Sequence, residues 1–299
     1  MITVANIVKC FEQKHALDDV SMQIEAGCVY GLVGTNGSGK STLLRLISGV
    51  YRADGGSILT DGEPTFENPP VKQKIFFVSD DLYFHPQATL SDMADFYKAA
   101  YPRWDEARYK RLCELFPVGT RRKLSAFSKG MRRQAALILA LSCAPEYLLL
   151  DEAFDGLDPV IRFAVRKIIS DMISEYNMTV VISSHNLREL EDFCDRVGLL
   201  HNGKLMLECA MDDIRIGFTK VQAVFRPMPE TIQPEGLRLL SKSVSGSVAT
   251  MVLQAGEEEA LAAVNQMNPI LAEAVGLTLE EVFIYEMEAV GYDYTKILF

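Results

Sequence analysis

The sequence contains no hydrophobic run long enough to cross a membrane. Its apolar runs, such as Tyr147–Leu150 and Thr179–Ile182, have the length of a strand, whereas a membrane-spanning helix needs roughly 18 to 20 apolar residues. The first residues, Met1–Ile7, also lack a basic region followed by a hydrophobic stretch. We therefore expect neither a membrane span nor a signal peptide.

Cysteine and positive charge are both scarce. The six cysteines, at positions 10, 28, 113, 143, 194 and 209, show no Cys-x-x-Cys spacing, so we expect reduced, buried thiols and no zinc site. The 30 Lys and Arg residues are outnumbered by 40 Asp and Glu residues, and the resulting net charge of −10 disfavours nucleic acid as a partner. These shortages are typical of a cytoplasmic protein that does not bind nucleic acid.

The chain does have enough apolar residues for a large domain and a small one, with 48% hydrophobic content over 299 residues. Residues 1–33 alternate like a small antiparallel β layer, and residues 88–116 have helical spacing. Short apolar strands end at Asp151 and Ile182. This alternation of strands and helices predicts an α/β fold built on a mostly parallel sheet.

The pattern changes near residue 218. Val221–Arg226 and Val248–Leu253 are typical of strands, and Glu257–Met267 is typical of a helix. Thr278 and Glu281 have the spacing of a capping box. We predict a main domain over residues 1–218 and a small accessory α+β domain over residues 219–299. The residues leave the role of that second domain open between packing or dimer stabilisation and ligand sensing.

The clearest motif is Gly34–Ser41, which fits G-x-x-x-x-G-K-[ST]. Glycines allow such a loop to wrap an oligophosphate with main-chain N–H groups, and the helix behind it points its positive end at the phosphates. Lys40 is expected to reach the β- and γ-phosphates of a nucleotide, and the Ser41 hydroxyl to bind Mg²⁺. The nucleotide-binding residues predicted here are Gly34, Thr35, Asn36, Gly37, Ser38, Gly39, Lys40, Ser41 and Thr42.

A second motif places two acids at the end of an apolar strand. Tyr147–Leu150 leads directly into Asp151 and Glu152, which is the Walker B pattern with its adjacent acid. A buried strand would hold Asp151 where its carboxylate binds Mg²⁺, directly or through water. Glu152 is then placed to accept or orient the proton of an attacking water.

A third motif lies between these two and precedes the apolar helix Ala135–Leu141. Its residues are Phe127, Ser128, Lys129, Gly130 and Met131. Ser-x-Gly before a helix is also an ordinary N-cap, but in this position the segment resembles the signature motif, Leu-Ser-Gly-Gly-Gln, of the ATP-binding-cassette (ABC) ATPases. Ser128 and Gly130 match that motif, and the other three residues depart from it. The resemblance covers roughly residues 1–218 and implies a P-loop NTPase core with a helical subdomain at about residues 86–145.

Two further segments carry the resemblance. His185, which follows an apolar strand, resembles the family's switch histidine, whose implied role is contact with the γ-phosphate during hydrolysis. Gly156, Leu157 and Asp158 resemble the D-loop, which in the family crosses between subunits. Together with Glu152 and the P-loop, these residues imply a magnesium-dependent ATPase.

Phe11 and Asp80 are the remaining positions that the resemblance singles out. Phe11 lies where the family places an aromatic ring on the adenine face, although packing in the core is the alternative for this residue. Asp80 stands where the family has Gln, in a loop that senses Mg²⁺ and couples to the membrane subunit. Either the metal shell is altered by this acid or its side chain points outward.

The resemblance also implies partners. In the family, the signature of one chain faces the γ-phosphate bound by another, and this chain has one P-loop and one signature, so two chains are required. We therefore expect an ATP-binding and ATP-hydrolysing subunit of a membrane transporter, of the exporter type, paired head to tail with an identical or a different ABC ATPase chain. It would dock on integral membrane permease subunits at the cytoplasmic face of the cell membrane. A soluble ABC ATPase that acts as an assembly or regulatory factor is the alternative class.

Overall fold

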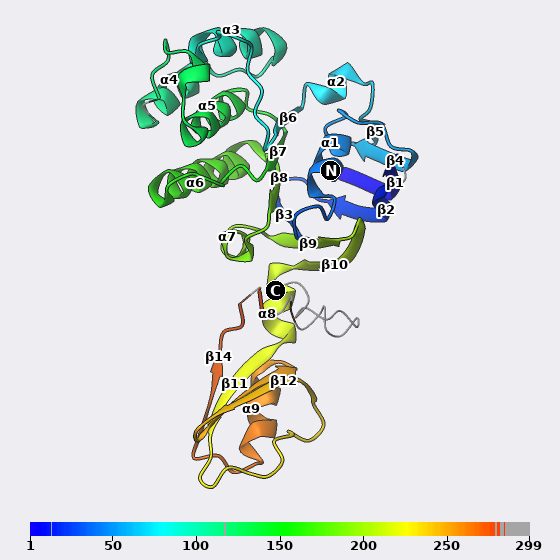
Figure 1. The fold of residues 1–299 in the computed structure, drawn as a ribbon, viewed down its shortest axis with the longest axis vertical. Helices are drawn as coiled ribbons and strands as arrows, with labels where there is room; N and C mark the ends of the chain where they lie inside the picture. Colours follow the sequence, from blue (N-terminus) through cyan, green and yellow to red (C-terminus); the bar gives the residue numbers. More distant parts are fainter. Residues whose placement is uncertain (13, 117, 279, 282–283, 285–299) are drawn as a thin grey trace. The chain divides into compact units, whose positions relative to one another are not determined.

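The computed structural model describes residues 1–12, 14–116, 118–278, 280–281 and 284 (Figure 1). The chain divides into two compact units. The first comprises Met1–Asn186 and Phe193–Glu208, and the second comprises Leu187–Asp192 and the described part of Cys209–Phe299. The boundary that we predict at residue 218 remains a prediction.

Two sheets form the centre of the first unit. The antiparallel sheet has the order β2 (Lys14–Ile24), β1 (Ile2–Phe11), β4 (Gly55–Thr60) and β5 (Glu63–Pro64). The larger sheet has the order β10 (Lys204–Ala210), β9 (Arg196–His201), β3 (Val29–Val33), β8 (Thr179–Ser184), β7 (Tyr147–Asp151) and β6 (Ile75–Val78). Within this sheet, β9, β3, β8, β7 and β6 run parallel to one another. The predicted α/β fold with an N-terminal antiparallel layer and a mostly parallel sheet is therefore confirmed.

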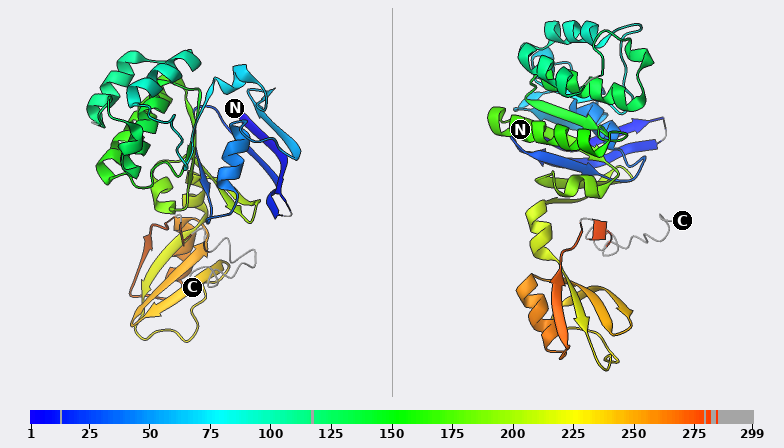
Figure 2. Two further views of the ribbon diagram at one scale, coloured as in Figure 1. Left: turned by 45° about the horizontal axis from the view of Figure 1, so that its top comes forward. Right: turned by 90° about the vertical axis from the view of Figure 1, so that its left-hand side faces the viewer.

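Helices surround this sheet, and three of them, α3 (Leu90–Ala100), α4 (Glu106–Leu115) and α5 (Lys129–Ser142), lie within residues 86–145, where we predict the helical subdomain. The other helices of the first unit are α1 (Lys40–Ile47), α2 (Pro69–Lys72), the 3₁₀ turn η1 (Leu124–Ala126) and α6 (Pro159–Tyr176). Figure 2 shows α3, α4 and α5, in cyan and green, grouped beside the sheet. Short polar side chains start these helices: Thr89 forms a capping box with Asp92, and Asp105 and Ser128 cap α4 and α5. No helix among the described residues is both long and apolar enough to cross a bilayer.

The core of the first unit anchors the P-loop helix. Leu43, Leu44, Leu46 and Ile47 of α1 are each at most 2% exposed and pack against β1, β2 and β3. Burying each such side chain contributes roughly 1.5–3 kcal/mol. The buried face of α1 therefore fixes the helix on the two sheets, and the end of the glycine-rich loop is fixed with it.

The second unit has its own small core. Its elements are α7 (Leu187–Glu191), α8 (Met211–Gly217), β11 (Thr219–Val224), β12 (Arg238–Ser245), β13 (Val248–Gln254), α9 (Glu257–Asn265) and β14 (Leu271–Val275). The four strands form an antiparallel sheet in the order β12, β13, β11, β14, and α9 packs on one face over Val221, Met251 and Leu253. The predicted α+β character is confirmed. The Thr278–Glu281 capping box is also present, with Glu281 N donating to Thr278 Oγ1 at 3.2 Å and Thr278 N donating to Glu281 Oε2 at 3.1 Å.

Candidate nucleotide site

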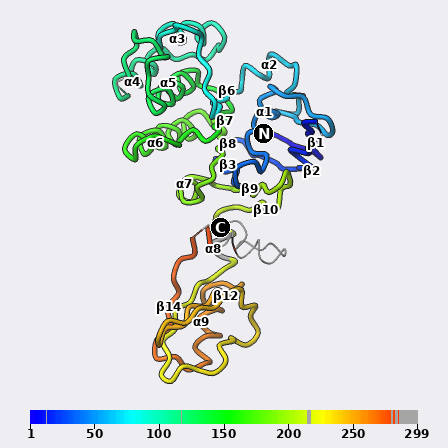
Figure 3. The backbone as a smooth tube through the Cα atoms, in the orientation of Figure 1, coloured from blue at the N-terminus to red at the C-terminus, as the bar shows by residue number. Residues whose placement is uncertain are grey.

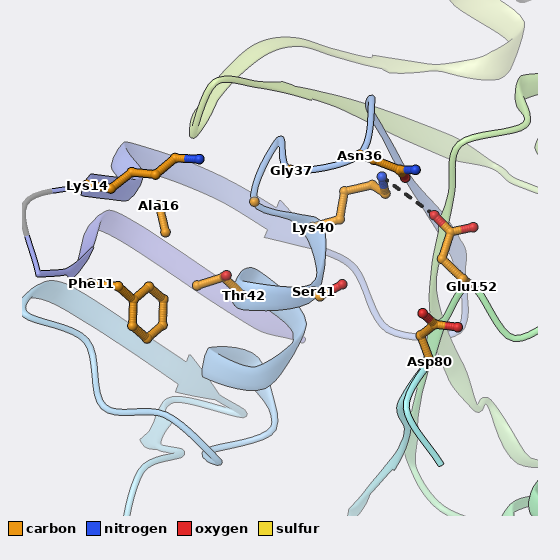
Figure 4. A pocket seen from close by; sticks show the side chains of 11 residues that line it. Phe11, Lys14, Ala16, Asn36, Gly37, Lys40, Ser41, Thr42, Asp80 and Glu152 are labelled. Atoms are coloured by element: carbon orange, nitrogen blue, oxygen red, sulfur yellow. Dashed lines mark ion pairs between the residues drawn. The ribbon is translucent and has the colours of Figure 1, made fainter.

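A pocket of about 310 Å³ opens where the β1–β2 hairpin meets the carboxyl ends of the parallel strands (Figure 4). Ligands bind at this end of the strands in open α/β sheets. The lining residues are Phe11, Lys14, Ala16, Asn36, Gly37, Gly39, Lys40, Ser41, Thr42, Asp80 and Glu152. The fold therefore brings together Phe11, most of the predicted P-loop residues, Asp80 and the second acid of the Asp151–Glu152 pair. Gly34, Thr35 and Ser38 belong to the loop but do not line the pocket.

The P-loop has a backbone that a larger residue would not permit. Gly39 has φ of +112°, and a Cβ placed on it would lie 2.7 Å from the carbonyl oxygen of Ala16. Gly39 directly precedes α1, whose first residue is Lys40. The loop can therefore lie against the β1–β2 hairpin and still present the free N–H groups at the start of α1 to the pocket.

Lys40 is a buried cation held at the pocket wall. Its side chain is 5% exposed, and its Nζ donates to the carbonyl oxygens of Gly34 at 2.6 Å and Thr35 at 3.2 Å. The same Nζ lies 3.5 Å from Glu152 Oε1. Burial lowers the pKa of the Lys40 ammonium, and the Glu152 and Asp151 carboxylates oppose that shift. The Lys40 ammonium therefore lies at the pocket wall, where its present acceptors are neutral carbonyl oxygens. Anionic oxygens accept stronger hydrogen bonds and would replace them.

Ser41, Asp151 and Ser183 form a group of hard oxygen ligands. Ser41 Oγ donates to Asp151 Oδ1 at 3.0 Å, and Ser183 Oγ donates to the same oxygen at 2.7 Å. Asp151 is fully buried, and its Oδ2 has no hydrogen-bond partner among the described residues. A buried carboxylate oxygen without a partner is costly. Carboxylate and hydroxyl oxygens are the ligands that Mg²⁺ prefers, so the residues present fit this ion.

Glu152 and His185 are brought into direct contact. His185 Nδ1 lies 2.9 Å from Glu152 Oε2, while the other carboxylate oxygen faces Lys40. Glu152 has φ of +49°, an unusual value for a residue with a side chain, which costs about 1–3 kcal/mol. Its main-chain N–H donates to Ser183 on β8, at 3.3 Å to the carbonyl oxygen and 3.1 Å to the hydroxyl. These contacts aim the Glu152 carboxylate into the pocket (Figure 4).

The signature residues lie outside the pocket. Ser128 is the exposed N-cap of α5, and its Oγ accepts from Met131 N at 3.3 Å. Gly130 lies so close to the D-loop that a Cβ on it would be 2.9 Å from the Gly156 carbonyl oxygen. Lys129 does not remain unpaired in solvent: its Nζ donates to Asp155 Oδ2 at 2.8 Å and thereby lowers the pKa of that carboxyl.

The D-loop itself is fixed by its ends. Phe154 and Leu157 are buried, and Asp158 caps α6 by accepting from the N–H groups of Val160 and Ile161. The signature and the D-loop therefore form one packed surface of α5 and α6, and none of their residues reaches the pocket of the same chain.

Two residues of the site were not predicted from the sequence. Ser183 belongs to none of the sequence motifs, yet its hydroxyl contacts both Asp151 and the Glu152 main chain. Arg133 also lies outside the motifs, although it is 1% exposed and donates to both the Asp80 carboxylate and the Glu152 carbonyl oxygen. The signal for Arg133 lies in its spacing: residues 133, 137 and 140 share the buried face of α5.

Known proteins resemble this chain in sequence and in fold. A family model described as ABC transporter matches residues 17–155. The ABC transporter ATP-binding protein YtrB of Bacillus subtilis is 31% identical over 285 residues, which cover 95% of this chain and 97% of that protein. The linearmycin resistance ATP-binding protein LnrL of the same species is 32% identical, covering 69% of this chain and 68% of LnrL. The bacitracin transport ATP-binding protein BcrA of Bacillus licheniformis is 28% identical, covering 72% of this chain and 71% of BcrA.

Solved structures show the same fold. A structure titled as the ATP binding subunit of an ABC transporter superposes with a TM-score of 0.66 at 26% identity, covering 72% of this chain and 92% of the other. A dimeric ATP-binding cassette bound to ADP and Pi has a TM-score of 0.63 at 22% identity, covering 71% of this chain and 99% of the cassette. The second likeness supports the fold of the first unit only.

Proposed function

Because this chain belongs to the ABC transporter family, as an ATP-binding and ATP-hydrolysing subunit, we propose that it hydrolyses ATP between two head-to-tail copies and thereby drives an export permease. The observation that carries this proposal is the position of the Glu152 carboxylate between Lys40 and His185, next to the oxygen ligands of Ser41 and Asp151. A cation for phosphates (Lys40), a general base (Glu152) and one magnesium ligand (Ser41) then line one pocket, and the buried Asp151 is hydrogen-bonded to Ser41.

Each of these residues has a distinct role in the proposed mechanism. Lys40 leaves the carbonyl oxygens of its loop and binds the β- and γ-phosphates, assisted by the N–H groups of the loop and of α1. Ser41 and Asp151 would hold Mg²⁺, and the ion would supply positive charge against the phosphate oxygens. Glu152 accepts the proton of the attacking water. His185, hydrogen-bonded to Glu152, orients that carboxylate and contacts the γ-phosphate.

A second chain is needed because the pocket of one chain includes no signature residue. Ser128 is exposed at the start of α5, a helix of 14 residues, where free N–H groups favour an anion. In a head-to-tail pair this helix start faces the γ-phosphate held by the other P-loop, and a symmetric pair has two equivalent sites.

The name of one relative, LnrL, supports the proposed direction of transport. LnrL is named for linearmycin resistance and BcrA for bacitracin transport. Export of a toxic compound is the transport direction that resistance requires, and we propose the same direction here. We further propose that the chain works at the cytoplasmic face of the cell membrane and that the second unit is an extension that stabilises packing or the dimer.

An exposed aromatic cluster next to Asp80 is the proposed docking site for the permease. Tyr83 is 75% exposed and Phe96 is 50% exposed, and His85 lies between them with ring centroids at 6.3 Å and 5.1 Å. Aromatic side chains are enriched at interfaces because they bury a large area with few rotatable bonds. A cytoplasmic helix of the permease would cover these rings.

Co-purification tests this partner. We expect the tagged chain, extracted with detergent from membranes of its native host, to carry a multi-span membrane protein with it. Tyr83→Glu should release that protein, because a charge would then be buried at the interface. Val244→Glu is the matched control, since Val244 is 51% exposed in the second unit. Retention of the membrane protein by Tyr83→Glu would contradict this docking surface.

The Phe11 ring is the proposed contact for the adenine base. It lines the pocket, is 43% exposed, and packs edge-on against Tyr51 at 5.6 Å. Stacking on a base is worth about 1–3 kcal/mol. We therefore expect Phe11→Ala to weaken MgATP binding about fivefold or more without lowering the melting temperature of the free protein. Phe96→Ala, which removes an equally exposed ring away from the pocket, should leave affinity unchanged in the same titration. Unchanged affinity in Phe11→Ala would instead assign Phe11 to packing alone.

A further inference from the structure

Arg133 is a buried cation that joins three segments of the first unit. It lies on α5 and is 1% exposed. Its Nη1 donates to the main-chain carbonyl oxygen of Glu152, and its Nη2 donates to Asp80 Oδ1. The same Nη2 lies 3.7 Å from Asp155 Oδ2, and Nε has no hydrogen-bond partner among the described residues. Helix α5 packs on β6, the strand that precedes Asp80 in the sequence. Figure 3 traces both elements in the first unit.

The acids that compensate the charge of Arg133 among the described residues come from two other segments. A buried guanidinium is costly unless it is paired and hydrogen-bonded. Asp80, in the loop after β6, and Asp155, in the D-loop, supply the two negative charges, while Lys129 shares Asp155. Asp80 is therefore the direct counter-ion of Arg133. This pairing explains how an acid can line the proposed phosphate pocket: the negative charge of Asp80 is neutralised by the Arg133 guanidinium.

The second guanidinium nitrogen of Arg133, Nη1, is bonded to the main chain of Glu152, the proposed base. Glu152 has φ of +49°, and both of its main-chain polar groups are bonded. The N–H donates to Ser183 on β8, and the carbonyl oxygen accepts from Arg133 on α5 and, at 3.1 Å, from the main-chain N–H of Asp155. These bonds fix the peptide planes on either side of Glu152, and the bond from Arg133 is the one that ties this backbone to α5. The Glu152 carboxylate can then remain between Lys40 and His185.

We infer that Arg133 is a positioning residue for ATP hydrolysis. Asp80 holds the Arg133 guanidinium in place, and Arg133 acts through the main chain of Glu152. The inference rests on the proposed role of Glu152 as the base. The planar guanidinium is required because its two Nη groups reach different acceptors at once, whereas a lysine ammonium is a single point charge. Arg133 does not line the nucleotide pocket, so it is expected to affect the rate of hydrolysis more than the binding of ATP.

The test is a set of steady-state ATPase titrations on the full chain. Arg133→Lys and Arg133→Gln should lower kcat by about tenfold or more, since a charge-assisted hydrogen bond to the base's backbone is lost. The KM for ATP should change by less than about threefold, because only a step after binding is altered. Arg132→Gln is the matched control: Arg132 is the neighbouring arginine, contacts the Leu82 carbonyl oxygen, and touches neither Asp80 nor Glu152. It should keep the wild-type kcat.

A double-mutant cycle tests the part played by Asp80. Asp80→Asn should lower kcat in the wild-type background and have little further effect in the Arg133→Gln background, because the two residues act as one unit. Equal effects in both backgrounds would overturn the pairing. If Arg133→Gln does not fold, Arg133→Lys and Asp80→Asn are compared by melting temperature, MgATP affinity and kcat.

The outcomes separate this inference from the proposed function. A wild-type kcat for Arg133→Lys, or a raised KM with unchanged kcat, would overturn the positioning role. A Glu152→Gln protein that keeps full activity would overturn the base assignment itself. Loss of activity in Glu152→Gln together with wild-type activity in Arg133→Lys would remove only the inference about Arg133.

Discussion

Lys40→Ala should bind MgATP at least about a hundredfold more weakly than the wild-type chain. The ammonium is the only side-chain cation of the P-loop segment Gly34–Ser41, and it is buried at the pocket wall. Each hydrogen bond from this ammonium to a phosphate oxygen is worth roughly 1.5–3 kcal/mol. Losing two of them should therefore weaken the binding of MgATP by at least about a hundredfold. Titration with a fluorescent ATP analogue, or isothermal calorimetry, measures the effect.

Lys14→Ala provides the control for charge alone. Lys14 lines the same pocket but is exposed on the β1–β2 hairpin, so its removal should weaken binding by much less. The melting temperature of both variants without nucleotide shows whether they are folded. An unchanged ATP affinity in a folded Lys40→Ala protein would exclude the P-loop as the phosphate site.

Local motifs and alternating strands were predictable because they depend on neighbouring residues. The Gly34–Ser41 loop, the strand that ends at Asp151 and the cap at Ser128 are all set by short-range spacing, and the structure has each of them. The fold class and the ATPase family were confirmed for this reason. The roles of the individual site residues remain proposals.

Charge pairs between distant segments were not predictable. Asp80 and Arg133 are 53 positions apart, and Lys129 and Asp155 are 26 apart. Sequence spacing gives no distance across such separations, because the register between α5, the loop after β6 and the D-loop is set by packing. For Asp80 the sequence left two alternatives, an altered metal shell or an outward acid. The structure shows a third arrangement, in which Asp80 lines the pocket while its carboxylate pairs with Arg133.

Glu152→Gln should convert the chain into a dimer that depends on ATP. Without the general base, hydrolysis should slow by about 10²–10⁴-fold, while Lys40, Ser41 and Asp151 still hold MgATP. The exposed N-terminus of α5 in the other chain then stays bound to a γ-phosphate that is not cleaved. Size-exclusion chromatography with light scattering should show a dimer with MgATP and a monomer with MgADP, because ADP lacks the phosphate that joins the two chains.

A second substitution at Ser128 tests which surface of the partner is used. Adding Ser128→Arg to Glu152→Gln should abolish the dimer, because the larger side chain occupies the helix start that meets the phosphate. The double variant should still bind MgATP in its own pocket, since Ser128 does not line it. A dimer that survives Ser128→Arg would exclude the signature segment as the contact. If Glu152→Gln stays monomeric with ATP bound, the site is not completed by a second copy of this chain, and the partner is a different ABC ATPase chain.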